Sequence, residues 1–133
     1  ATAALAFEVV GDSLQDLFQG ATQALIETLA DPETVSGTWQ QRIERSDGDP
    51  AALLFDWLSD LVYWKDAEGV VFRDVELAVV RDEQIWNLVA ILHGAPVDYR
   101  TQTLRDDVKG ITKHLYAVKQ ENVRWCARVV VDI

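Results

Sequence analysis

Two runs decide the fold of this chain, Asp107-Val108-Lys109-Gly110-Ile111-Thr112-Lys113-His114-Leu115 and Ala127-Arg128-Val129-Val130-Val131-Asp132-Ile133. They predict a hairpin of two strands, over residues 108–119 and 123–132, that turns at Glu121-Asn122. Both strands carry polar groups in an otherwise apolar sheet. Since a buried polar group without a partner is costly, these groups point to a site or to specific contacts.

The second run closes on Asp132 and Ile133, directly after three consecutive valines. Because side chains alternate between faces in a strand, Asp132 shares a face with Val130 and Arg128. We expect the Asp132 carboxylate and the main-chain or terminal oxygens of Ile133 to gather at one point. Such oxygens are the ligands of a hard cation such as Ca²⁺ or Mg²⁺. The ordinary alternative is that Asp132 pairs with Arg128 or is solvated.

The rest of the chain divides into short elements with recognisable boundaries. Asp12 or Ser13 is positioned to cap a first helix, which Asp31-Pro32 ends. Asp49-Pro50 begins a second helix, since an acidic N-cap followed by proline favours a helix start, and Glu68-Gly69 stops it. Further strands are predicted over residues 5–10, 34–46, 70–80 and 85–93, and a polar loop over residues 94–106.

The order of predicted elements is β-α-β-α-β-β-β-β. Two helices packed on one mainly antiparallel sheet make a two-layer α+β fold. A length of 133 residues suits a single domain, and we assign residues 1–133 to it. With 49% hydrophobic residues, the chain is able to bury a core without a disulfide or metal.

The charge of the chain limits its partners. Twelve basic residues against 22 acidic ones give a net charge of −10 and a sequence pI near 4.5. This balance argues against direct nucleic-acid binding and favours cations or a basic protein surface. The single Cys126 cannot form an internal disulfide, which favours a reducing, cytoplasmic location. We find neither a membrane-spanning segment nor a signal peptide.

Other polar residues of the predicted strand 108–119 are candidates as well. Simple alternation places Lys109 and Lys113 on one face and His114 on the other. A single histidine in a strand is more often a structural residue than a ligand, and His93 is placed less favourably still. Three acidic groups fall in predicted turns, where we expect them to be solvated: Asp47-Gly48-Asp49, Asp82-Glu83 and Asp106-Asp107.

Three pieces of the sequence together resemble the archease family, over nearly the whole chain. The first is Gly11-Asp12-Ser13-Leu14-Gln15-Asp16-Leu17-Phe18 at the start of the first helix. The second is Asp56-Trp57-Leu58 with Glu68-Gly69-Val70-Val71-Phe72. The third is the segment from Asp107 to His114 together with the closing run that ends at Ile133. In this order and spacing, the pieces are fairly specific.

The resemblance implies a protein cofactor, not an enzyme. Archeases activate the RtcB-type 3′-phosphate RNA ligase of tRNA splicing, by promoting guanylylation of its active-site histidine and multiple turnover. They are thought to offer an acidic, metal-binding tip to the ligase. Carried over, Asp132 is a metal ligand and Lys109 lies near the tip, while Asp107 stands where the family commonly has Glu. With His114, Lys109 and Asp107 are the candidate partner-binding residues.

The chain departs from the family pattern at its start. Archeases carry His-Thr-Ala-Asp before the first strand, and this Asp is a metal ligand. Here the aligned residues are Ala1-Thr2-Ala3-Ala4, so Ala4 stands where the family has the ligand. Removing one of two charged ligands weakens a hard-cation site. We therefore expect the site for Ca²⁺, Mg²⁺ or Mn²⁺ to be weakened or lost.

Two other functions compete with ligase activation. One is a general chaperone or protein-interaction module without ligase specificity, because a fold alone does not decide function. The other is a small metal-dependent hydrolase, which is disfavoured because no activated nucleophile or base can be identified in the sequence.

Overall fold

The structure, a computed structural model, describes residues 3–133. Its elements follow the predicted order, with one short 3₁₀ helix added. In chain order they are β1 (Ala4–Gly11), α1 (Leu14–Leu29), η1 (Pro32–Thr34), β2 (Trp39–Asp47), α2 (Pro50–Glu68), β3 (Val70–Asp82), β4 (Ile85–Pro96), β5 (Gly110–Glu121) and β6 (Arg124–Asp132).

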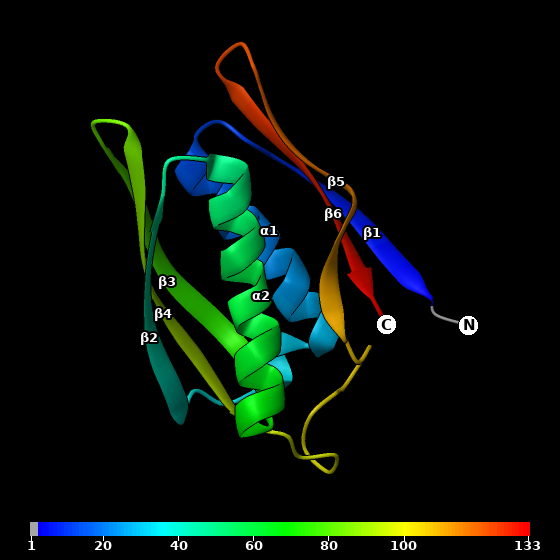
Figure 1. The fold of residues 1–133 in the computed structure, drawn as a ribbon. Coiled ribbons are helices and arrows are strands. Elements are labelled where there is room, and N and C mark those ends of the chain that lie inside the picture. The colour runs from blue at the N-terminus through cyan, green and yellow to red at the C-terminus, as the bar shows by residue number, and fades with distance from the viewer. Residues whose placement is uncertain (1–2) are drawn as a thin grey trace.

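The α+β class with two helices and antiparallel strands is confirmed, but the strands form two sheets and not the single sheet predicted. One three-stranded sheet has the order β1-β6-β5, and the other has the order β2-β4-β3 (Figure 1). The predicted hairpin over residues 108–132 is present as β5–β6, and the strands predicted over residues 70–80 and 85–93 form a second hairpin, β3–β4. The division arises because β1 pairs with β6 at the far end of the chain, and not with β2, β3 or β4.

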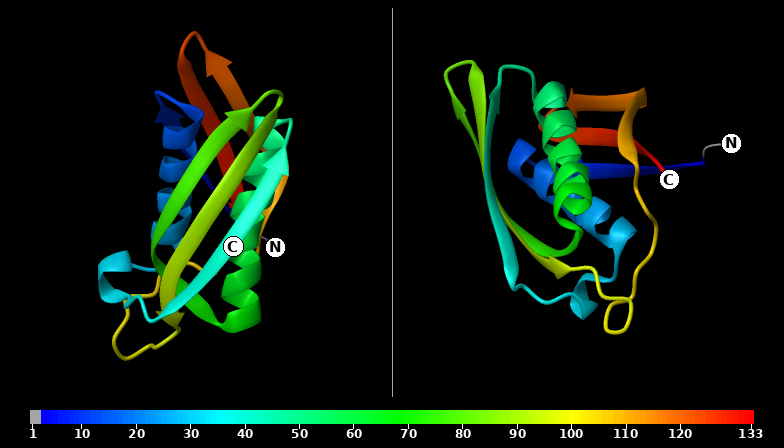
Figure 2. Two further views of the ribbon diagram at one scale, coloured as in Figure 1. Left: turned by 90° about the vertical axis from the view of Figure 1, so that its left-hand side faces the viewer. Right: turned by 60° about the horizontal axis from the view of Figure 1, so that its bottom comes forward.

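The two helices lie between the sheets, which gives three layers in place of the two expected (Figures 1 and 2). Each helix packs against strands of both sheets. The buried stripe of α1 runs from Leu14 to Leu29 at helical spacing, and that of α2 runs from Leu53 to Lys65. Both helices are therefore covered on two sides. Within residues 3–133, no helix is long and apolar enough to cross a membrane.

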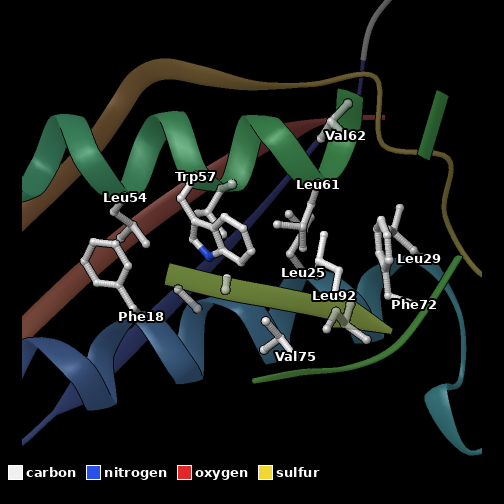
Figure 3. Packing of buried hydrophobic residues seen from close by; sticks show 14 of the residues in the cluster. Phe18, Leu25, Leu29, Leu54, Trp57, Leu61, Val62, Phe72, Val75 and Leu92 are labelled. Carbon is white, nitrogen blue, oxygen red and sulfur yellow. The ribbon is translucent and has the colours of Figure 1, made fainter. Parts of the chain in front are cut away.

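The core is centred on Trp57, which is fully buried and points from α2 toward α1 (Figure 3). Its indole N–H donates to the Thr22 hydroxyl at 2.8 Å, and that hydroxyl donates to the Phe18 carbonyl at 2.6 Å. These two linked hydrogen bonds satisfy the polar atoms that the two helices bury against each other. Phe72 and Leu92 extend the same core into the β2-β4-β3 sheet.

The local signals that bound the helices are confirmed. Ser13, and not Asp12, caps α1, since its hydroxyl accepts the Asp16 N–H at 3.0 Å. Asp49 caps α2 in the same way, and Gly69 ends that helix in the left-handed conformation at φ 63°. The predicted strand 34–46 is partly wrong, because its first residues belong to η1 and the loop that follows, and β2 begins only at Trp39.

A glycine of β4 allows close contact with β3. A Cβ at Gly94 would meet the carbonyl oxygen of Val71, whereas a Cβ at Gly110 would have no atom within 4 Å. We expect Gly94→Ala to lower the free energy of unfolding by about 1–3 kcal/mol, as overpacking does. The matched change Gly110→Ala should be neutral or slightly stabilising. Urea unfolding of both variants checks this, and equal effects would contradict it.

Candidate functional site

Asp132 lies in the central strand of its sheet, between position 4 and position 110. Register places it opposite Ala4 of β1 and opposite Gly110 of β5. The Ile133 N–H donates to the Ala3 carbonyl at 3.0 Å, so Ala3 and Ile133 form a hydrogen-bonded pair. Ala4 and Asp132, the next pair, are then a non-hydrogen-bonded pair, the type that brings side chains closest.

The backbone around Asp132 is fixed from both sides. The Lys109 N–H donates to the Asp132 carbonyl at 2.7 Å, which ties the residue before β5 to the end of β6. The Ile133 N–H is bound to Ala3, the residue directly before β1. Lys109, Asp132 and position 4, which the family resemblance singles out, therefore lie at one end of one sheet.

The Asp132 side chain is half-buried on the outer face of the sheet, away from the helices. The alternative that it pairs with Arg128 is wrong, because the Arg128 guanidinium contacts the Glu8 carboxylate at 3.2 Å. Within residues 3–133, no hydrogen bond or ion pair reaches the Asp132 carboxylate.

The residues present do not fit a tightly held hard cation. Ca²⁺ takes six to eight oxygen ligands, and Mg²⁺ needs near-octahedral oxygens. Here the side chains offer one carboxylate, that of Asp132, while the Asp132 carbonyl already accepts the Lys109 N–H. No group of three or more His, Cys, Asp or Glu residues that could hold a metal occurs in the part of the chain that the structure describes.

Lys65, near the end of α2, is a residue that the sequence did not single out. Its ammonium is largely buried and contacts the carboxylates of Asp66 at 2.6 Å and Asp107 at 2.8 Å. Burial acts to lower the pKa of Lys65, but the hydrogen bonds to Asp107 and Asp66 outweigh it and raise that pKa. The hydrogen bond and charge of Lys65 lower the pKa of Asp107.

Asp107 is therefore an anchor as well as a candidate contact. Its ion pair holds the loop before β5 to the end of α2, two residues ahead of Lys109. The expectation that Asp106-Asp107 lies in an exposed loop is confirmed, but Asp107 also forms an ion pair that was not expected. The sequence did hold one signal for the burial of Lys65: it lies seven residues after Leu58, on the apolar stripe of the helix.

The predicted alternation of strand 108–119 is wrong. Lys109 lies just before β5, and the register shifts between Thr112 and Ala117, where Leu115 has a left-handed φ of 60°. The bulge leaves the His114 side chain exposed on the surface. The backbone N–H of His114 donates to the Thr112 hydroxyl at 3.1 Å. His114 is thus not brought together with Asp132 by a shared strand face.

The same bulge attaches β5 to the start of α2. The Tyr116 hydroxyl donates to the Ala51 carbonyl at 2.6 Å, and its ring packs edge-on against Phe55 at 5.3 Å. Burial, followed by the charges of nearby acids, raises the pKa of Tyr116. Lys113 covers the Phe55 ring at 5.2 Å. His93 lies in the other sheet, where it contacts Glu76 at 2.7 Å.

Fold and site together define a class of small α+β proteins, in which two sheets enclose two helices and the first and last strands pair with each other. The chain matches the family model described as Archease protein family (MTH1598/TM1083) over residues 1–133, and it belongs to that family.

Relatives and solved structures agree with this assignment. The chain is 33% identical over 132 residues to protein archease of Methanopyrus kandleri, with 99% of this chain and 94% of that protein covered. It is 31% identical over 133 residues to protein archease of Pyrococcus abyssi, with the same shares covered. The solution structure of Methanobacterium thermoautotrophicum protein 1598 matches with a TM-score of 0.83 at 27% identity, covering 100% of this chain and 94% of that one. A crystal structure of a Thermotoga maritima archease, at 17% identity, shares the fold with a TM-score of 0.67, covering 97% of this chain and 90% of that one.

The Lys65–Asp107 pair predicts a pH dependence of stability. Because the pKa of Asp107 is lowered by folding, its contribution is present above its unfolded pKa, about 3.9, and is lost as the pH falls through its folded value. Wild type should therefore lose stability relative to Lys65→Met as the pH falls from about 5 through the folded pKa of Asp107. The change should stay below about 1 kcal/mol, since Asp107 is mostly exposed. Urea unfolding across this range, with Asp107→Asn as the control that should also flatten the curve, checks the assignment; parallel curves for all three proteins would reject it.

The register of Ala4 against Asp132 predicts that one substitution restores cation binding. Ala4→Asp should bring a second carboxylate beside the first and raise Ca²⁺ affinity by at least about tenfold. Ala6→Asp is the matched control, because it adds the same charge on the same face but opposite Val130. Calorimetric titration with CaCl₂ measures both, and adding Asp132→Asn should abolish the gain. Equal gains from Ala4→Asp and Ala6→Asp would show that net charge, and not the paired site, binds the ion.

Proposed function

We propose that this chain is a protein cofactor that activates an RtcB-type 3′-phosphate RNA ligase in tRNA splicing or RNA repair in the cytoplasm. In this role it promotes guanylylation of the ligase and multiple turnover, and is not itself an enzyme. Membership of the archease family supports the proposal. The observation that carries it is the meeting of Lys109, Asp132 and position 4 at one end of one sheet.

The charge of the chain supports a ligase as the partner. An RNA ligase has to attract phosphates to its active site, and a protein with a net charge of −10 is complementary to such a surface. Asp132 is suited to direct contact, because its carboxylate is free of internal ion pairs within residues 3–133. Lys109, exposed beside it, supplies the one cationic side chain that the family resemblance places at this end.

The role proposed for Asp132 does not require a resident cation. With alanine at position 4, the chain presents Asp132 itself to the partner, and its own contribution is a carboxylate held in a fixed position by β1 and Lys109. A divalent cation bound here is at most weakly held by this chain.

A general chaperone or protein-interaction module is the second candidate function. The Thermotoga maritima archease is described as a possible chaperone, which favours testing this activity as well. The two functions differ in what they demand: a ligase activator needs one partner, whereas a chaperone suppresses aggregation of unrelated proteins.

The test is single-turnover transfer of labelled GMP to a purified RtcB-type ligase, with and without this chain. The chain should accelerate guanylylation, and Lys109→Ala and Asp132→Asn should each reduce that acceleration by at least about tenfold. Lys119→Ala is the matched control, because it removes another exposed lysine of the same sheet and should leave activation unchanged.

An aggregation assay with unrelated clients separates the alternatives. Absence of acceleration together with suppression of client aggregation would reject ligase activation and support the chaperone function. Equal losses from Lys109→Ala and Lys119→Ala would show that general charge, and not the end of the β1-β6-β5 sheet, acts on the ligase.

A further inference from the structure

Each sheet of this protein has two edge strands, β1 and β5 in one and β2 and β3 in the other. An edge strand presents unpaired N–H and C=O groups that bind an added strand, so proteins usually protect their edges. Three of these four edges carry a covering side chain, a bulge or several charged residues, whereas β1 carries one charged residue, Glu8, which is paired with Arg128 of the neighbouring strand.

The edge of β3 is covered by a side chain that imitates a strand. The Gln15 side-chain amide donates from Nε2 to the Leu77 carbonyl at 2.8 Å. Its Oε1 accepts the Val79 backbone N–H at 2.6 Å. This pair of hydrogen bonds occupies the groups that a further strand would need.

The edges of β5 and β2 are protected in other ways. The bulge between Thr112 and Ala117 breaks the regular spacing of β5, with Leu115 in a left-handed conformation. The β2 strand carries the charged residues Arg42, Glu44 and Arg45, and charges on an edge discourage pairing.

The β1 strand has a regular and open edge. Its register with β6 runs from Ala4 to Gly11 without a bulge, and Ala3–Ile133 is a hydrogen-bonded pair. The N–H and C=O groups of Ala4, Ala6, Glu8 and Val10 must therefore point away from β6. In the described chain, no side chain or loop backbone hydrogen-bonds to these groups.

Side chains around this edge favour a cationic partner. Ala4 and Ala6 expose only methyl groups on the outer face, so a long side chain of an added strand can cross them. One strand further in lies the Asp132 carboxylate, which has no internal ion pair in residues 3–133. The added strand would stand two inter-strand spacings from β6, roughly 10 Å, which an extended Lys or Arg and the Asp132 side chain together span.

We propose that the β1 edge binds an extended, basic segment of a partner protein, which adds to the β1-β6-β5 sheet as a fourth strand (Figure 1). Backbone hydrogen bonds to Ala6 and Glu8 supply the pairing, and a Lys or Arg that lies over Ala4 forms an ion pair with Asp132. The overall charge of −10 favours a basic segment over a second copy of this acidic chain. The proposal goes beyond ligase activation and does not depend on it.

The test uses a capped eight-residue peptide that alternates Lys and Thr, with a Glu–Thr peptide of the same length as its control. Amide hydrogen exchange of the unmodified chain, followed by NMR, reports where each peptide binds. The Lys–Thr peptide should slow exchange at Ala6 and Glu8, whose N–H groups point outward. It should leave Phe7 and Val9 unchanged, because their N–H groups already face β6. The Glu–Thr peptide should bind at least about tenfold more weakly.

Two variants test the backbone and the charge separately. Ala6→Pro removes one outward N–H without touching the β1–β6 ladder, and should weaken Lys–Thr binding by about tenfold, whereas Ala6→Ser should not. Asp132→Asn should weaken binding of the Lys–Thr peptide severalfold and leave the Glu–Thr peptide unaffected. The proposal is overturned if the Lys–Thr peptide does not bind, or binds without slowing exchange at Ala6 and Glu8. Equal binding to the Ala6→Pro and Ala6→Ser variants, both folded by circular dichroism, would also overturn it.

Discussion

The pairing of β1 with β6 is the interaction on which the rest of the structure depends. It joins strands from the two ends of the described chain and completes the sheet that covers the helices opposite β2, β3 and β4. The same register sets Ala4 against Asp132 and so fixes which side chains lie together at this end of the sheet. The position of this sheet against the helices and the geometry of the site therefore both depend on the register of β1 with β6.

Local structure could be predicted from the sequence because its signals are local. The caps at Ser13 and Asp49, the left-handed Gly69 and the two hairpin turns involve residues close together in the chain. The partition of the strands into two sheets could not be predicted from the sequence, since the hydrophobic pattern of a strand does not specify which strand it pairs with. The shift within β5 at Leu115 could not be predicted either, because strand alternation alone does not locate a bulge or a left-handed residue.

The candidate site shows the same limit. The face of Asp132 followed from alternation along β6, which has no bulge against β1. The anchor formed by Lys65 and Asp107 joins α2 to a loop 42 residues later, and nothing in either segment names the other. Lys109 and Asp132 lie far apart in the chain and meet through one backbone hydrogen bond, and Ala4, opposite Asp132, adds no second carboxylate. On the proposals made above, this single carboxylate acts by contact with a cationic group of a partner and not by holding a cation.

The most direct test of the central claim is cross-linking of positions 4 and 132. In a Cys126→Ser background, Ala4→Cys with Asp132→Cys should form a disulfide on mild oxidation, since Cα atoms of such a pair lie roughly 4.5 Å apart. The diagonal pair, Ala6→Cys with Asp132→Cys, should not, because its separation is about 7–8 Å. A disulfide formed by the diagonal pair, or by neither, would contradict the register and with it the account of the site.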